Sequence, residues 1–279
     1  MSEPTRERIP LADGDVSCLT WNGNGPLLHF AHANGFNAET YRSLLASLSD
    51  RFDIVASDAR GHGRTTLPAT PGLQHGWTIF RDDLLGILDR IAPNSAILAG
   101  HSMGATASLM AAALRPEKLR ALVLVEPVLM PKEIAPGDNV LARRAEKRRD
   151  FFASRDEAFT LYRGRSAFKT WPDDMLHDYL EAGLEATEAG FRLSCRPAWE
   201  AEDFRTTPSG VSGLARMLRC PVTLIHAKDG TASENEVAIF KQLYPVTRVV
   251  LKQDATHFLP MEFPELVRDE ITRIARPAA

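Results

Sequence analysis

The stretch Gly100-His101-Ser102-Met103-Gly104 places a serine between two glycines, directly after the apolar run Ala96-Ile97-Leu98-Ala99. An alanine-rich segment, residues 105–114, follows it and ends before Pro116. This order predicts a strand, a tight turn and a helix, with Ser102 on the turn. A serine hydroxyl is a weak nucleophile at neutral pH, and a strained turn of this kind exposes it to a base and to backbone N–H donors. We therefore predict that Ser102 is a catalytic nucleophile.

A serine nucleophile needs a base and an acid that orients the base. His257 follows the last expected strand in a loop before a helix, and an imidazole there could reach Ser102 and take its proton. Two carboxylates could orient the histidine. Asp229 lies just past the strand expected over residues 221–227, and Glu126 lies just past the preceding strand. We expect Asp229 to be the acid, because its turn projects toward the His257 loop, and we keep Glu126 as the alternative.

The oxyanion that forms during acyl transfer needs two backbone N–H donors. One should be Met103, directly after the nucleophile. The second should come from the loop His32-Ala33-Asn34-Gly35-Phe36, where Gly35 lets the chain turn and leaves the Phe36 amide free. His101, beside the serine, is expected to be structural.

Short runs rich in Val, Ile and Leu alternate with longer amphipathic segments, which is typical of βαβ units. Since the apolar strands are continuous and do not alternate with polar residues, we expect a sheet covered on both faces. The expected strands cover residues 16–21, 27–31, 52–57, 95–99, 119–125, 221–227 and 247–251. The other expected helices cover residues 41–48, 77–91, 233–243 and 264–274.

Residues 131–218 interrupt this alternation. They contain no convincing strand, but they do contain charged helical stretches with aromatic residues. We expect a helical cap there, inserted between two parts of one core, residues 1–130 and 219–279. A basic run within it, Arg143 to Arg149, is expected to be a solvated face, with attraction of an anionic substrate as the alternative.

Composition sets further bounds. The 279 residues carry a formal net charge of −3, which argues against nucleic acid or an anionic membrane as the main partner. Cys18, Cys195 and Cys220 are widely scattered, so neither a disulfide framework nor a metal site is indicated. The N-terminal segment is polar, and no stretch is long enough to cross a bilayer. We expect a cytoplasmic protein, a monomer or small homo-oligomer, without membrane insertion.

The chain resembles the α/β-hydrolase superfamily over its whole length outside the expected cap. The resemblance is carried by residues 32–36, 58–63 and 100–104, by Asp229, and by His257 with Glu262-Phe263-Pro264. It implies a mostly parallel eight-stranded sheet flanked by helices, a lid inserted after the sixth strand, and no cofactor. The chain departs from the pattern in two places: its oxyanion segment is His-Ala-Asn-Gly, and no proline follows Asp229, which keeps Glu126 open as the acid.

Ser102 argues against the relatives that use an aspartate nucleophile, such as epoxide hydrolases. The resemblance therefore implies a serine hydrolase that cleaves carboxylic esters or lactones of small to medium apolar substrates through an acyl-enzyme intermediate. Thioester, amide or C–C bond hydrolysis and acyl transfer use the same residues and remain alternatives. A ligand-binding, receptor-like protein is the non-enzymatic alternative.

Overall fold

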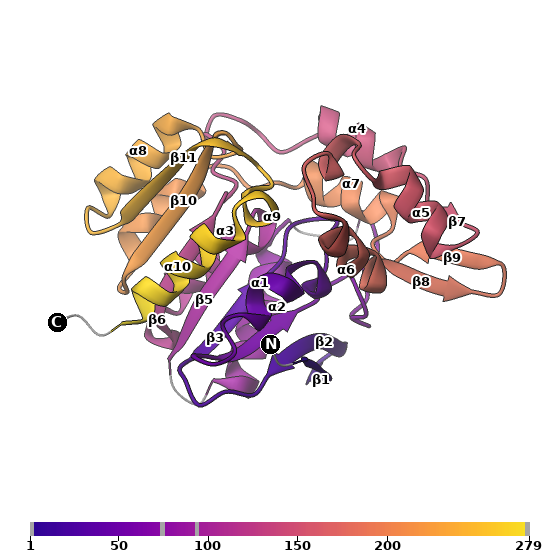
Figure 1. The fold of residues 1–279 in the computed structure, drawn as a ribbon. Helices are drawn as coiled ribbons and strands as arrows, with labels where there is room; N and C mark the ends of the chain where they lie inside the picture. Colours follow the sequence, from indigo (N-terminus) through magenta and orange to yellow (C-terminus); the bar gives the residue numbers. More distant parts are fainter. Residues whose placement is uncertain (1–2, 73–75, 93–94, 277–279) are drawn as a thin grey trace.

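The computed structural model of the chain describes residues 3–72, 76–92 and 95–276. The extreme ends of the expected core, residues 1–2 and 277–279, lie outside them. An eight-stranded sheet in the order β1-β2-β4-β3-β5-β6-β10-β11 forms the centre of the molecule (Figure 1). Its strands are β1 (Thr5–Leu11), β2 (Gly14–Trp21), β3 (Leu27–Ala31), β4 (Asp53–Ser57), β5 (Ala96–His101), β6 (Leu119–Val125), β10 (Val222–Asp229) and β11 (Arg248–Thr256). The expected mostly parallel eight-stranded sheet is thereby confirmed. Among its described strands, the pairs of β2 with β1 and with β4 are antiparallel, and the other neighbouring strands pair parallel.

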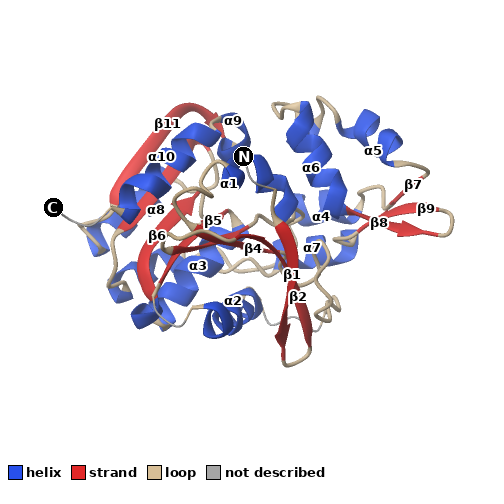
Figure 2. Cartoon of the chain, turned by 60° about the horizontal axis from the view of Figure 1, so that its bottom comes forward, coloured by secondary structure: helices blue, strands red, loops and turns tan. Residues whose placement is uncertain are grey.

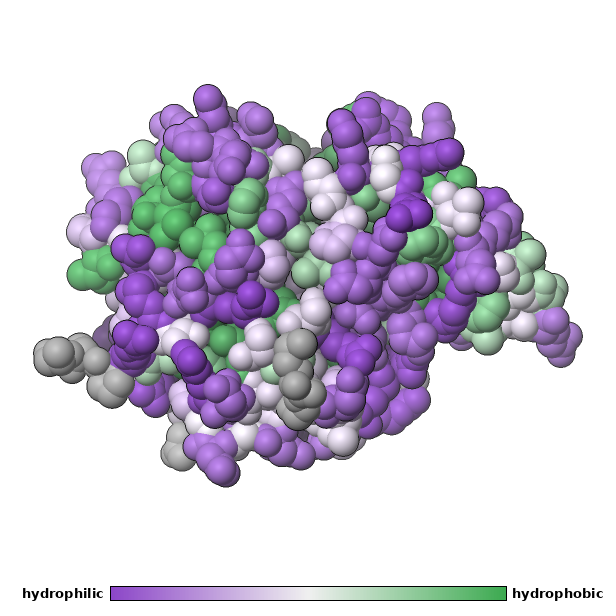
Figure 3. Space-filling model, viewed as in Figure 1, coloured by the Kyte–Doolittle hydropathy of each residue, from purple (hydrophilic) through white to green (hydrophobic). Residues whose placement is uncertain are grey.

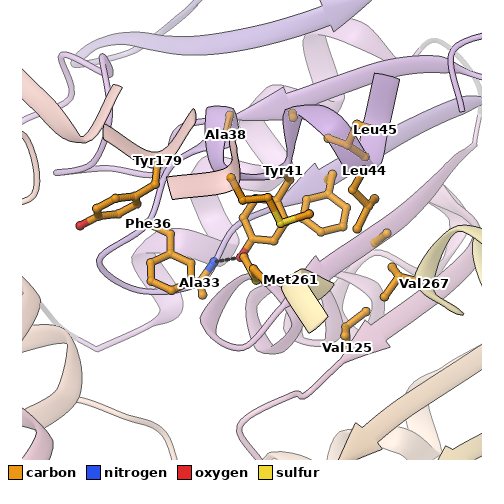
Figure 4. Close-up of a cluster of buried hydrophobic side chains, with 14 of the residues drawn as sticks. Ala33, Phe36, Ala38, Tyr41, Leu44, Leu45, Val125, Tyr179, Met261 and Val267 are labelled. Atoms are coloured by element: carbon orange, nitrogen blue, oxygen red, sulfur yellow. Dashed lines mark hydrogen bonds between the residues drawn. The ribbon is translucent and has the colours of Figure 1, made fainter. Parts of the chain in front are cut away.

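Helices cover both faces of this sheet, and their apolar sides contribute to two large clusters of buried residues. One cluster joins α1 and α10 to one sheet face, and the other joins α2, α3 and α8 to the opposite face. Figure 4 shows part of the first cluster, where Leu44 and Leu45 of α1 lie near Val267 of α10. The helices concerned are α1 (Arg42–Ala46), α2 (Thr78–Ile91), α3 (Met103–Leu114), α8 (Glu234–Leu243) and α10 (Pro264–Ala275). Short helices complete the core: η1 (Ala38–Tyr41), η2 (Pro116–Lys118) and α9 (Leu259–Glu262).

The register of the parallel strands brings their carboxyl ends to one edge of the sheet. Ala31 of β3 pairs with Gly100 of β5, and His101 of β5 pairs with Val125 of β6. Val125 in turn pairs with Ile225 of β10. Loops that follow these four strands therefore meet at one place, which is where ligands bind in open α/β sheets.

The segment between β6 and β10 is mainly helical, as expected, but it also contains a small antiparallel sheet in the order β7-β9-β8, which differs from the expectation of no strand. These strands span two to four residues, too few for an alternating pattern to be visible in the sequence. We call residues 131–218 the insert. Its elements are α4 (Val140–Glu146), β7 (Phe151–Phe152), α5 (Arg155–Tyr162), η3 (Ser166–Phe168), α6 (Asp173–Gly183), β8 (Leu184–Thr187), β9 (Gly190–Leu193), α7 (Pro197–Arg205) and η4 (Val211–Met217).

The two views place most of the insert beside the core, above the carboxyl ends of the central strands (Figures 1 and 2). Its last element, η4, packs instead against α3 and α8, with Val211 and Ala215 inside the core cluster. The division of the chain at residue 218 stays a prediction.

Strand β1 was not predicted from the sequence. It lies at the edge of the sheet and is mostly exposed, so its polar sequence Thr-Arg-Glu-Arg lacks the apolar run of a central strand. The surface in Figure 3 is mainly hydrophilic, with an apolar area at the side where β11 and α8 lie. Among the described helices, none combines the length and hydropathy needed to cross a bilayer.

Candidate active site

Ser102 lies on the sharp turn that joins β5 to α3. Its φ is 54°, in the left-handed region that non-glycine residues rarely adopt. The flanking glycines have no room for a side chain: a Cβ on Gly104 would lie 2.3 Å from the Ala31 carbonyl oxygen, and one on Gly100 would lie 2.7 Å from the Ala105 nitrogen. The serine N–H donates to the Val125 carbonyl at 3.0 Å. The turn expected from the Gly-x-Ser-x-Gly pattern is therefore present.

His257, in the loop between β11 and α9, contacts the serine as expected. Its Nε2 lies 3.0 Å from Ser102 Oγ. Its Nδ1 lies 3.1 Å from Oε2 of Glu126. Ser102 is 7% exposed and Glu126 is fully buried, while the side chain of His257 is 24% exposed, so solvent reaches the hydrogen-bonded series at the histidine.

The carboxylate on His257 is that of Glu126, not Asp229, and the expectation for Asp229 is corrected on this point. Strand β10 does not turn before Asp229: it continues through this residue, which pairs with Thr256 of β11 and is exposed. Glu126 instead follows the end of β6 with a φ of 50°. Its carboxylate accepts hydrogen bonds from the N–H groups of Ala227 at 2.5 Å and Thr231 at 2.8 Å.

Gly230 makes room for this glutamate, and Thr231 hydrogen-bonds to it. A Cβ on Gly230 would lie 2.1 Å from Glu126 Oε2, so the missing side chain is what admits the longer carboxylate. Thr231 Oγ1 also lies 3.3 Å from His257 Nδ1 and 3.3 Å from the Glu126 carbonyl oxygen. Sequence reasoning missed Thr231. The signal available in the sequence was the position of Thr231 just after Asp229, in a segment that lacks the proline of the family pattern.

The two expected oxyanion donors differ in whether their N–H group already donates to an acceptor within the chain. Met103 is the first residue of α3, and the first N–H groups of a helix have no intrahelical acceptor. Phe36 lies in a turn where Gly35 has a φ of 74°. The Phe36 N–H was expected to be free, but it already has an acceptor. It donates to the Ala33 carbonyl at 3.1 Å, because the four-residue turn closes its own hydrogen bond.

Two histidines join the loop of residues 32–36 to the loop after β4 through hydrogen bonds. His32 Nδ1 donates to the Ala33 carbonyl at 2.7 Å, so its Nε2 accepts from the Ala59 N–H at 2.8 Å. His62 Nδ1 donates to the Arg60 carbonyl at 2.9 Å, and its Nε2 accepts from the Gly35 N–H at 3.0 Å. Burial lowers the pKa of His62 to about 3 and also lowers the pKa of His32. Both rings are therefore neutral near pH 7, as acceptors must be.

Aromatic rings from the insert meet the core next to Phe258, which lies against the His257 ring at 5.6 Å between ring centroids. Phe36 packs edge-on against Trp171 at 5.1 Å and against Tyr179 at 5.8 Å, and it stacks on Phe258 at 6.2 Å between ring centroids. Phe258 directly follows His257. The insert thus supplies part of an apolar wall at the site. Two backbone contacts join the same loop to the insert, since Asn34 and Asn37 side chains donate to the carbonyls of Glu200 and Tyr179.

The basic run of the insert is not a uniform solvated face. Arg143 is exposed and pairs with Asp138 at 2.6 Å. Arg148 is half-buried, pairs with Glu200 and donates to the Tyr179 hydroxyl at 2.9 Å. Burial opposes the charge on Arg148, but Glu200 and the neighbouring tyrosines hold the pKa of its guanidinium well above the usual range. Because Glu200 neutralises Arg148, this arginine is not a free anion site.

Comparisons with known proteins point to one family. The model of the alpha/beta hydrolase family matches residues 30–270. The chain is 28% identical over 263 residues to the 2-(acetamidomethylene)succinate hydrolase of Mesorhizobium japonicum, with 92% of each chain covered. It is 25% identical to the pimeloyl-(acyl-carrier protein) methyl ester esterase of Nitrosospira multiformis, with 91% of this chain and 96% of the relative covered. The crystal structure of an E-2-(acetamidomethylene)succinate hydrolase matches with a TM-score of 0.84 at 26% identity, covering 98% of this chain and 99% of that chain.

Proposed function

The chain belongs to the alpha/beta hydrolase family, and from this premise we propose that it is a serine hydrolase that cleaves carboxylic esters or lactones of small to medium apolar acyl substrates. The observation that carries the proposal is the hydrogen-bonded series Glu126–His257–Ser102, with 3.1 Å and 3.0 Å between its members. A serine, a base in contact with it and a carboxylate that orients the base are the groups that acyl transfer requires.

In the proposed mechanism His257 Nε2 takes the Ser102 proton as Oγ attacks the substrate carbonyl carbon. Glu126 accepts from Nδ1–H, fixes the tautomer and stabilises the imidazolium that forms. The imidazolium then gives its proton to the leaving alkoxide as the carbonyl–oxygen bond breaks, which leaves an acyl-serine. Water, deprotonated by His257, attacks the acyl-serine and releases the acid and the free hydroxyl.

The Met103 and Phe36 N–H groups are the proposed oxyanion donors. Met103 is at a helix N-terminus, which favours negative charge. The Phe36 N–H, 3.1 Å from the Ala33 carbonyl oxygen, would be shared between that carbonyl and the oxyanion. One N–H shared between two acceptors is a common arrangement at helix termini, and the same geometry is proposed here for the turn.

The apolar wall supports an apolar acyl group, because Phe36, Trp171 and Phe258 pack on one another and Phe258 lies against the His257 ring at 5.6 Å between ring centroids. Amide hydrolysis is the second candidate. It is supported by the relative from Mesorhizobium japonicum, whose substrate name contains an acetamide and which aligns with 92% of this chain. A cytoplasmic location and a monomer or small homo-oligomer stay predictions from composition.

The test is hydrolysis of p-nitrophenyl esters of graded acyl length, simple lactones and acetanilides by the wild type and Ser102→Ala. We expect ester or lactone turnover, covalent labelling of Ser102 by an organophosphonate, and a loss of at least about 10³-fold in kcat for Ser102→Ala. Turnover of acetanilides in preference to esters would favour the second candidate. Wild-type protein that turns over none of these substrates and resists labelling would contradict the proposal and favour a receptor-like binding role.

A further inference from the structure

His101, the residue before the serine, lies in a buried hydrogen-bonded chain that connects two loops. The Ala33 N–H donates to the Tyr41 hydroxyl at 3.2 Å, which is the dashed contact in Figure 4. The Tyr41 hydroxyl lies 2.7 Å from His101 Nδ1. His101 Nε2 lies 2.8 Å from the backbone carbonyl of His257. Ala33 belongs to the loop that contains Phe36, and His257 belongs to the loop of the base.

The chain has one consistent direction. A carbonyl oxygen can only accept, so His101 Nε2 must carry a proton and donate to His257. In a neutral ring Nδ1 is then an acceptor, and the Tyr41 O–H donates to it. The lone pairs of the Tyr41 oxygen remain available to the Ala33 N–H. Burial, followed by the neighbouring His257, lowers the pKa of His101 well below its usual range, which keeps the ring neutral.

This arrangement fixes the base relative to the nucleophile. His101 is rigidly placed because it ends β5 and is fully buried. Its hydrogen bond to the His257 carbonyl therefore fixes the distance between the His257 loop and the Ser102 turn. The imidazole rings of His101 and His257 lie 5.0 Å apart between centroids. Tyr41 is 1% exposed and packs on Phe30 at 4.7 Å, so its hydroxyl holds the Ala33 turn at a defined distance from the same histidine.

We propose that Tyr41 and His101 are positioning residues for acyl transfer, which together hold the His257 loop and the oxyanion loop in register with Ser102. Neither side chain touches the reacting atoms. His101 acts through the backbone carbonyl of His257, and Tyr41 acts through the backbone N–H of Ala33, in the loop that contains Phe36. The inference rests on the proposed serine hydrolase function.

Tyr41→Phe tests this with the loss of one oxygen atom, and Tyr244→Phe is the matched control. Tyr244 donates to the Cys220 carbonyl at 3.1 Å, away from the site. On the best ester substrate we expect Tyr41→Phe to lower kcat about 10-fold with KM within about 2-fold, because misplaced catalytic groups weaken transition-state binding more than substrate binding. Affinity for a trifluoromethyl ketone that forms a hemiketal with the serine should fall by a similar factor. Tyr244→Phe should leave both unchanged.

His101→Gln and the double variant complete the test. Glutamine can still donate to the His257 carbonyl but cannot accept from Tyr41 in the same place. If the two residues act as one chain, the double variant should lose no more kcat than His101→Gln alone. Rates are referred to the folded fraction, measured by circular dichroism at the assay temperature. Tyr41→Phe with wild-type kcat and ketone affinity, in an enzyme whose Ser102 is labelled by organophosphonate, would overturn this inference alone. A wild type without turnover or labelling would overturn the proposed function and this inference with it.

Discussion

Two side chains at the centre of the site are held on a backbone that L-residues seldom adopt. Ser102 has a φ of 54° and Glu126 a φ of 50°. Each such conformation costs roughly 1–3 kcal/mol and persists only where neighbouring contacts enforce it. Here the N–H groups of Ser102 and Glu126 donate to Val125 and Ile225 at 3.0 Å and 2.8 Å. Paired strands therefore supply the constraint that points both side chains toward His257.

At the residue scale, Glu126→Gln should lower kcat by about 10²- to 10⁴-fold with little change in KM, because a neutral amide neither fixes the His257 tautomer nor stabilises its charge. Asp229→Asn is the control, since Asp229 is exposed, and it should keep kcat within about 2-fold. Steady-state kinetics on one ester compare the two. Equal losses in both variants would show that the assignment of Glu126 is wrong.

Gly230→Ala should also impair turnover, although Gly230 carries no reactive group. Its new Cβ would lie 2.1 Å from Glu126 Oε2 and would push the carboxylate away from His257. We expect kcat to fall at least about 10-fold. Gly213→Ala is the matched control, because its Cβ would meet no atom within 4 Å. Wild-type kcat in Gly230→Ala would mean that the Glu126 position is not critical.

At the element scale, the insert and the core loops share the site. The segment of residues 33–37 is held by hydrogen bonds to Tyr41 and His62 of the core and to the backbone carbonyls of Glu200 and Tyr179 of the insert. Thr170 of the insert likewise donates to Glu262, which also accepts from Thr256 beside the base. Movement of the insert would therefore be transmitted to both the oxyanion loop and the His257 loop.

Trp171→Ala should change substrate preference more than catalysis. The indole packs on Phe36 and Phe258 at 5.1 Å and 6.2 Å, so its removal opens the aromatic wall next to His257. We expect the ratio of kcat/KM for long over short acyl esters to rise about 10-fold. Phe151→Ala, which removes an exposed ring of the same insert, should leave the ratio unchanged. An unchanged chain-length profile in Trp171→Ala would place the acyl group elsewhere.

At the scale of the whole molecule, several histidines are buried in neutral form. Burial lowers the pKa of His29 and His62 to about 3 and that of His101 well below its usual range. These groups stay neutral in the folded state while the unfolded chain binds protons below about pH 6.5. Stability is therefore complete above pH 6.5 and is lost as the pH falls toward 3. Asp178, whose pKa burial raises to about 6, acts in the opposite direction as a single group.

The free energy of unfolding should consequently fall between pH 7 and pH 5. A pKa lowered from 6.5 to about 3 implies a loss of roughly 2 kcal/mol per histidine at pH 5 for His29 and for His62. Urea titrations at the two pH values measure the change, and His62→Gln should reduce it by the share of one histidine. A free energy of unfolding that is equal at pH 7 and pH 5 would contradict the neutral burial of these rings.

Local sequence was sufficient for most elements and for two site residues. The apolar runs of β3, β5 and β6 and the glycines around Ser102 each carry their own signal, because a strand or a tight turn depends on neighbouring residues. His257 was predicted because it follows the last expected strand and comes after the serine and the acid along the chain. Strand β1 and the small sheet of the insert were missed, since a mostly exposed, polar edge strand and strands of two to four residues have no such signal.

The sequence by itself therefore determined the sheet and the elbow, and it supplied the prediction that Ser102 and His257 are nucleophile and base. Only the tertiary structure decided which carboxylate reaches His257, because that choice depends on β10 continuing through Asp229 and on the space above Gly230. It also decided that the Phe36 N–H bonds within its turn and that Tyr41 and His101 join two loops. Such contacts link residues up to 156 positions apart, where separation along the chain carries no information about distance in space.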